Sequence, residues 1–215
     1  MNRKRRPLVS GELRPSDALL ITAAAIIIGV GASLMINLYC AAIAAAFAAL
    51  SLLYTYRLKE LPLVGNAYVA LSMSIPFIFG SYVVGTPGVA ILSIFALVFL
   101  AGLAREIDGA VRDYYGDVGK RGARTLPAVI GRKASAWAAM ALYAVAVCIS
   151  IYLFLAVPPF MNSIVYPEVI AVVDAMMLYS GAVFAAGIER LYGQVRNVSL
   201  AGMALALVCI LVSVL

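Results

Sequence analysis

Long apolar runs separated by short polar segments dominate the pattern along this chain. A membrane-spanning helix needs about 20 mostly apolar residues, and runs of that length recur almost from end to end. The pattern predicts seven spanning helices, at about residues 16–36, 38–56, 66–84, 88–107, 134–157, 165–188 and 198–215. We therefore expect an all-α integral membrane protein, formed as a single domain over residues 1–215.

The composition agrees with this prediction, because 65% of the residues are hydrophobic and only 12% are charged. A soluble domain of this length is less apolar. The net charge is +6, but no DNA-binding motif accompanies it, so we expect no nucleic acid partner. The basic segment Met1–Pro15 has no apolar core and does not predict a cleavable signal peptide. Without His or paired cysteines, the chain predicts no zinc or haem site.

The sixteen Lys and Arg residues all lie on one side of the membrane if the seven helices alternate in direction. The connections that carry them are 1–15, 57–65, 105–133 and 189–197. No base lies in the opposite connections, which fall around Asn37, 81–88 and 158–164. The positive-inside rule then predicts a multi-pass cell-membrane protein with its N-terminus in the cytoplasm and its C-terminus outside. Contacts with lipid headgroups account for several bases, including Arg132 and Lys133.

An acidic stretch, REIDGAVRDYYGDVGKRGARTLP at 105–127, closes the fourth apolar run. At about 100° per residue, Glu106, Asp113 and Asp117 fall on one stripe of a helix, and Asp108 points to the opposite face. Three carboxylates on one stripe repel one another unless a divalent cation lies among them. The stretch therefore predicts a Mg²⁺ site, although a solvated helix end is the simpler alternative.

A second polar cluster, Tyr54–Lys59, closes the second apolar run at a similar depth. Carboxylates and bases at one depth suit a diphosphate, whose oxygens the metal and the bases would share. Tyr54 and Tyr56 could place a hydroxyl or a ring face beside a developing allylic cation. An interfacial aromatic belt with a snorkelling base is the alternative for this cluster.

Several motifs together resemble a known family. They are RPLVSG at 6–11, YTYRLK at 54–59, PLVGN at 62–66, PFIFG at 76–80, the acidic stretch and RTLPAVIG at 124–131. The chain resembles the UbiA superfamily of intramembrane prenyltransferases, within it the archaeal digeranylgeranylglyceryl phosphate synthase branch. The resemblance implies a bundle of nine transmembrane helices around a central cavity. It also implies Mg²⁺-dependent transfer of a prenyl group from a polyprenyl diphosphate to an acceptor.

In the archaeal branch, the resemblance implies geranylgeranyl diphosphate as the donor and geranylgeranylglyceryl phosphate as the acceptor, in ether-lipid biosynthesis. Magnesium bound by Asp113 and Asp117, with help from Glu106, would hold the diphosphate. Further contacts to the diphosphate would come from Arg57, Lys59, Lys120, Arg121 and Arg124. The acceptor hydroxyl would attack the allylic carbon, and the apolar bundle would hold the prenyl tail and exclude water.

The sequence departs from the family pattern in two places. The family's first acidic motif, NDxxDxxxD, lies just before the segment matched by Asn2–Gly11. In this register the chain corresponds to the nine-helix bundle without its first two helices, and a separately encoded N-terminal portion could complete it. In the second motif, Ala110 stands where the branch usually has Asp and Gly109 where it usually has Lys. We expect Asp108, displaced by two residues, not to replace the missing carboxylate.

Other functions compete with this interpretation. A CDP-alcohol phosphotransferase motif fails, because Lys120 stands where that motif requires Asp. A transporter would need ionisable or broken-helix positions near the midplane, and only Asp174 and Pro76 qualify. For Asp174 we expect a structural hydrogen bond to a neighbouring helix. Two alternatives remain open. One is an inactive fragment or pseudoenzyme that acts as a structural or binding membrane protein, and the other is a prenyltransferase for an aromatic acceptor of the quinone or haem type.

Overall fold

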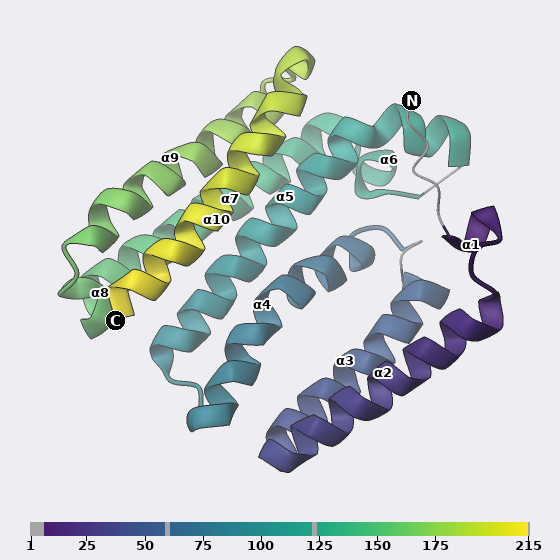
Figure 1. The fold of residues 1–215 in the computed structure, drawn as a ribbon. Coiled ribbons are helices and arrows are strands. Elements are labelled where there is room, and N and C mark those ends of the chain that lie inside the picture. The colour runs from purple at the N-terminus through teal and green to yellow at the C-terminus, as the bar shows by residue number, and fades with distance from the viewer. Residues whose placement is uncertain (1–6, 59–60, 122–123, 215) are drawn as a thin grey trace.

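The computed structural model of the protein describes residues 7–58, 61–121 and 124–214. Within these ranges it contains helices and no β-strand (Figure 1). Seven helices are long and apolar enough to cross a membrane. They are α2 (Pro15–Ile36), α3 (Leu38–Tyr56), α4 (Val64–Val84), α5 (Val89–Arg121), α7 (Arg132–Ala156), α9 (Val165–Ala185) and α10 (Tyr192–Val214). The prediction of a multi-pass, all-α membrane protein is confirmed.

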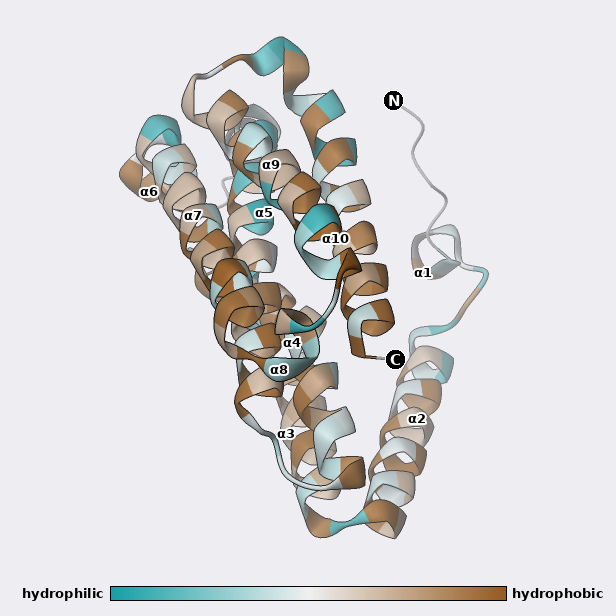
Figure 2. Cartoon of the chain, turned by 90° about the vertical axis from the view of Figure 1, so that its left-hand side faces the viewer, coloured by the Kyte–Doolittle hydropathy of each residue, from teal (hydrophilic) through white to brown (hydrophobic). Residues whose placement is uncertain are grey.

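Four short elements mark the two ends of the bundle. At one end lie α1 (Pro7–Ser10), α6 (Leu126–Ile130) and the 3-10 helix η2 (Glu189–Leu191), and at the other lies α8 (Pro158–Met161) (Figure 1). Successive long helices run in opposite directions, so the connections predicted to share a side do so. Figure 2 shows hydrophilic residues gathered toward the α6 end and hydrophobic residues along the helices. We call the α6 end the base-rich end.

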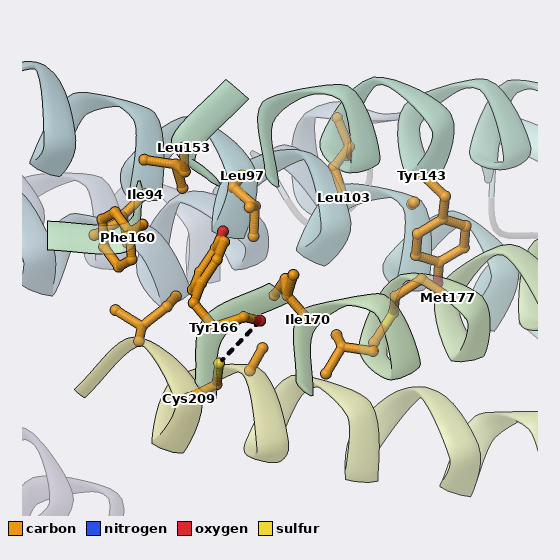
Figure 3. Packing of buried hydrophobic residues seen from close by; sticks show 14 of the residues in the cluster. Ile94, Leu97, Leu103, Tyr143, Leu153, Phe160, Tyr166, Ile170, Met177 and Cys209 are labelled. Atoms are coloured by element: carbon orange, nitrogen blue, oxygen red, sulfur yellow. Dashed lines mark hydrogen bonds between the residues drawn. The ribbon is translucent and has the colours of Figure 1, made fainter. Parts of the chain in front are cut away.

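Helix α5 lies at the centre of the packing. It contacts α4 on one side and α7 on the other, and α9 packs between α7 and α10. Residues at a three- and four-residue spacing form its buried stripe, which comprises Ile94, Leu97, Ala101, Ala104, Asp108 and Val111. Of these, Ile94, Leu97 and Ala104 join a core that includes Leu153, Phe160 and Tyr166 (Figure 3). The periodicity of α5 therefore fixes which of its faces meets the neighbouring helices.

Helix α2 packs mainly against α3 and leaves most of its surface uncovered. Leu20 and Ile27 on α2 are 74% and 72% exposed. Asn37 joins the two helices: its side chain accepts a hydrogen bond from the Cys40 amide, at 2.8 Å, and donates one to the Tyr82 carbonyl, at 2.6 Å. Asn37 thus caps α3 and ties the α2–α3 turn to α4.

The structure corrects two predicted boundaries. The fourth run was expected to end at 107, but α5 continues as one helix of 33 residues to Arg121. The last helix begins at Tyr192 rather than 198, and the Ser180 hydroxyl of α9 donates to the Val195 carbonyl, at 3.3 Å. In both segments polar residues lower the mean hydropathy, so the apolar run is shorter than the helix. Buried residues such as Val111 and Val195 keep each helix packed against its neighbours.

Two isolated polar features of the spans are structural. The Ser150 hydroxyl of α7 donates to the Asp174 carboxylate of α9, at 2.5 Å, which confirms the predicted hydrogen bond to a neighbouring helix. Pro76 lies inside α4, which continues through it from Val64 to Val84. The broken helix that a transporter would need is therefore absent at Pro76.

Close helix contacts predict how three glycines tolerate substitution. A Cβ on Gly181 of α9 would lie 2.8 Å from Met140 Sδ and 3.0 Å from Tyr143 Cδ2, whereas one on Gly202 would meet chiefly the flexible end of Met177, at 2.7 Å. We expect Gly181→Ala to destabilise the protein by about 1–3 kcal/mol and Gly202→Ala to cost less. Thermal unfolding in detergent measures both.

The matched control is Gly29→Ala in α2, where a Cβ meets nothing within 4 Å. Alanine is the better helix former by about 1 kcal/mol, so this variant should be as stable as the original or more so. Equal melting temperatures for Gly181→Ala and Gly29→Ala would contradict the packing described here.

Candidate functional site

A pocket of about 410 Å³ opens at the base-rich end of the bundle. Helices α3, α4, α5, α9 and α10 line it, together with Thr125, which precedes α6. Its polar and charged lining consists of Tyr54, Asn66, Arg105, Glu106, Asp108, Arg112, Asp113, Thr125, Arg196 and Ser199. We call this cavity the polar pocket.

Helix α5 supplies most of the charge, in adjacent base–acid pairs. Arg112 binds Asp113 through two hydrogen bonds, of 2.8 Å from Nε and 2.7 Å from a terminal nitrogen. Arg105 lies 3.4 Å from Glu106. The Asp113 side chain remains 53% exposed, and exposed ion pairs are weak, typically below about 1 kcal/mol. The Asp113 carboxylate is therefore available to a ligand that competes with Arg112.

The structure brings together some of the predicted site residues and not others. Tyr54, Glu106 and Asp113 line the polar pocket, and Tyr54 stacks on Tyr68 with ring centroids 4.4 Å apart. Three other predicted site residues are exposed and do not line the pocket: Tyr56, Arg57 and Arg124.

For four predicted site residues, the structure does not describe the side chain or the whole residue. Lys59 lies outside the described residues. Asp117, Lys120 and Arg121 belong to α5, but their side chains are not described. Their proposed roles stay predictions.

The chemistry of the lining suits a hard cation. Glu106 and Asp113 both present carboxylate oxygens to the polar pocket, and Asp117 follows Asp113 by one helical turn. Mg²⁺ prefers such oxygen ligands and retains several waters, so it needs only one or two carboxylates. Among the described residues, no three Cys, Asp or Glu side chains are grouped to hold a metal ion.

Asp108 is the main site residue that the helical stripe missed. It was expected to point away from the other acids, but it lines the polar pocket while being only 4% exposed. The pocket wraps around a wide arc of α5, from Ala110 on one side to Asp108 on the other. The signal was present in the sequence, since Asp108 follows Ile94 and Ala101 at heptad spacing and so belongs to the buried stripe.

Three arginines of the lining were also missed as ligands: Arg105, Arg112 and Arg196. Arg105 and Arg112 are seven residues apart, so they share a face of α5. Arg196 was assigned to a loop, and only the earlier start of α10 carries it into the pocket. No sequence signal places Arg196 opposite α5.

Arg132 at the start of α7 does not serve merely as a lipid anchor, which corrects the sequence-based assignment. It pairs with Glu189 at 2.7 Å and donates to the Tyr115 hydroxyl at 3.0 Å. Its guanidinium also lies 4.8 Å from the Tyr115 ring centroid. Arg132 thus links the acidic end of α5 to α7 and η2.

Comparison with known proteins assigns the chain to a family. A family model described as the UbiA prenyltransferase family matches residues 1–191. The chain belongs to the UbiA prenyltransferase family. Members of this family are membrane prenyltransferases that generally use Mg²⁺.

Curated relatives cover most of this family member. Digeranylgeranylglyceryl phosphate synthase of Methanopyrus kandleri is 34% identical over 217 residues, covering 100% of the chain and 77% of the relative. The same enzyme of Archaeoglobus fulgidus is 34% identical over 212 residues, covering 96% and 71%. A solved structure from work on digeranylgeranylglyceryl phosphate synthase in membranes superposes with a TM-score of 0.84 at 26% identity, covering 100% of the chain and 75% of that structure.

The contacts of Arg132 predict the stability of the acidic end of α5. Arg132→Ala removes the ion pair with Glu189 and the contact with Tyr115, so the end of α5 should open more readily. We expect amide hydrogen exchange at residues 110–116 to accelerate about fivefold, since the lost contacts sum to roughly 1 kcal/mol. Mass spectrometry of exchanged peptides measures this.

Two variants control this experiment. Arg132→Lys retains the charge but loses the planar stacking, so its effect should be intermediate. Lys133→Ala removes the exposed neighbouring base and should leave exchange unchanged. Equal acceleration in Arg132→Ala and Lys133→Ala would show that net charge, and not these contacts, holds the end of α5.

Proposed function

We propose that this family member transfers a geranylgeranyl-type prenyl group from a polyprenyl diphosphate to a lipid acceptor such as geranylgeranylglyceryl phosphate, in ether-lipid biosynthesis. The observation that carries the proposal is the polar pocket, which gathers arginines and carboxylates at one end of an apolar bundle. The names of the relatives in two archaea support the choice of acceptor.

The diphosphate would bind to the arginines of the polar pocket. Arg105, Arg112 and Arg196 come from two helices and line one cavity, and guanidinium groups bind phosphate oxygens through paired hydrogen bonds. Arg57, Lys59, Lys120, Arg121 and Arg124 lie in connections that the sequence predicts on the same side of the membrane, and they would add contacts from the edge of the pocket. As the allylic C–O bond breaks, these positive charges stabilise the charge that grows on the leaving diphosphate.

Asp113 and Asp117, with Glu106, would hold the magnesium ion. When bound, Mg²⁺ supplies positive charge that offsets the charge of the diphosphate. To bind the metal ion, Asp113 must give up its hydrogen bonds with Arg112. Arg112 is then free to bind the diphosphate. Tyr54, whose ring is fixed by stacking on Tyr68, would present its face toward the allylic end of the donor, with Tyr56 nearer the membrane surface.

The prenyl chain would enter a second cavity of about 290 Å³, which we call the apolar pocket. Helices α4, α5, α7, α9 and α10 line it, with residues such as Phe77, Leu97, Met177 and Met203. Such a lining excludes water from the reactive allylic carbon. This arrangement treats residues 1–215 as one domain, with the polar pocket and the N-terminus at the cytoplasmic face and the C-terminus outside.

The direct test combines purified protein in lipid vesicles, geranylgeranyl diphosphate, geranylgeranylglyceryl phosphate and Mg²⁺. We expect a doubly prenylated ether product, and chelation of Mg²⁺ should abolish its formation. Asp113→Asn should lower the rate about 100-fold, because it removes a charged ligand at the site of growing charge. Glu168→Gln, an exposed acid at the start of α9, is the matched control.

A protein that neither forms this product nor binds the donor would overturn the proposal and favour a structural or lipid-binding role. A product only with an aromatic acceptor would retain the transferase and change the substrate. The comparisons offer no support for a separately encoded N-terminal portion, so the assay uses the chain as it stands.

The position of Arg196 predicts a specific defect in donor binding. Arg196→Ala removes one charge from the polar pocket, and a charge-assisted hydrogen bond contributes about 1.5–3 kcal/mol. We expect the KM for the polyprenyl diphosphate to rise at least tenfold. Arg190→Ala, in η2 and outside the pocket lining, should change it less than twofold. A similar KM in both variants would exclude Arg196 as a diphosphate ligand.

A further inference from the structure

Unpaired buried polar atoms gather around the polar pocket. Among the described residues, buried side-chain atoms without a hydrogen-bond partner include Arg105 Nε, Thr125 Oγ1, both Asp108 carboxylate oxygens and the Tyr143 hydroxyl. Arg105, Asp108 and Thr125 line the polar pocket. Native proteins pair nearly all buried polar groups, so a concentration of unpaired ones at a cavity points to a ligand.

Asp108 and Tyr143 lie where the two pockets meet. Asp108 lines the polar pocket and Tyr143 lines the apolar pocket. Asp108 is 4% exposed and Tyr143 is fully buried, beside Met177 in the core (Figure 3). The Tyr143 hydroxyl lies within hydrogen-bonding reach of the Asp108 carboxyl, but among the described residues neither group makes a hydrogen bond of good geometry, so both can still bind a ligand.

Packing alone does not account for Asp108. Its position on the stripe of α5, between Ala104 and Val111, would suit an apolar residue, and a buried acid without a partner destabilises a fold. Every neighbour on the stripe is apolar, and Tyr143 contributes a second unpaired group at the same place. A ligand that binds both would relieve the cost of burying them.

The chemistry of the two groups identifies that ligand. An ionised phosphate offers the Asp108 carboxylate no hydrogen-bond donor, and a metal ion offers the Tyr143 hydroxyl no acceptor. A hydroxyl both donates and accepts a hydrogen bond, so it can donate to Asp108 and accept from Tyr143. An amphiphile with its head in the polar pocket would place a hydroxyl beside that head at this boundary.

We propose that Asp108 and Tyr143 bind the free hydroxyl of the lipid acceptor at the boundary between the polar and apolar pockets. This inference rests on the proposed function, because it assigns the acceptor's place in the same site. Asp108 and Tyr143 would then determine which acceptor binds. An acceptor with a free hydroxyl forms hydrogen bonds with both residues, and an acceptor without a hydrogen-bond donor leaves the Asp108 carboxylate unpaired.

The test compares geranylgeranylglyceryl phosphate with its methyl ether, in which the free hydroxyl is capped. Equilibrium binding to the full chain in vesicles should favour the free hydroxyl about tenfold, since an unpaired buried group weakens binding by at least that factor. In Asp108→Ala and Tyr143→Phe this preference should fall to less than twofold. The KM for the acceptor should rise about tenfold in both variants, while the KM for the diphosphate donor stays within twofold.

Stability separates binding from a structural role. If Asp108 serves the ligand, Asp108→Ala removes an unpaired buried acid and should leave the melting temperature of the ligand-free protein unchanged or higher. A structural role would lower it. Tyr166→Phe is the matched control for Tyr143→Phe, because Tyr166 is equally buried and donates to the Ser150 carbonyl, at 3.2 Å, outside both pocket linings. It should keep the preference for the free hydroxyl.

Asp108→Asn provides a second variant at this position, which retains hydrogen bonding and should restore part of the preference. The proposal is overturned if the original protein does not prefer the free hydroxyl, or if Tyr143→Phe and Asp108→Asn keep the full preference. If these variants still transfer the prenyl group and still prefer the free hydroxyl over its methyl ether, the role of Asp108 and Tyr143 is rejected and the proposed transferase function stands. A lost preference in the variants of a protein without transferase activity would support the binding site and reject the proposed reaction.

Discussion

The packing of α5 against α4 and α7 is the interaction on which the rest of the structure depends. Along one helix, apolar residues such as Leu97 and Ala104 face the core, and farther along the same helix Glu106, Arg112 and Asp113 face the polar pocket. A membrane interior requires every backbone polar group to be paired within the segment. A continuous helix meets that requirement and carries charged side chains from the core to the membrane surface without a break.

The same constraint explains why the site lies at an end of the bundle. Charged groups are costly at the centre of the membrane, so the arginines and carboxylates of the polar pocket gather in the second half of α5 and the first turns of α10. Arg132, Tyr115 and Glu189 then hold these ends together across three elements. A preorganised site of this kind can stabilise developing charge with little rearrangement.

The apolar pattern of the core is interrupted at Asp108 and Tyr143, where a buried acid and a buried hydroxyl have no hydrogen bond of good geometry among the described residues. Natural proteins depart from consistent patterning chiefly at functional sites. Asp174 provides the contrast within this chain, because its carboxylate accepts a hydrogen bond from Ser150 and so needs no ligand. The buried Asp108 and the partly buried Asp174 therefore differ by whether the protein itself supplies a hydrogen-bond donor.

The sequence alone determined the membrane class, the seven spans, their alternation and the end at which charge gathers, because hydropathy and the positions of the bases depend on local composition. It also singled out Glu106, Asp113 and Tyr54, which line the polar pocket. Only the tertiary structure decided which other charged groups reach the pocket. Helical spacing gives the angle between residues of one helix, but the position of Arg196 in the polar pocket depends on how α10 packs beside α5. That packing arises from side chains distant in sequence, and no local pattern records it.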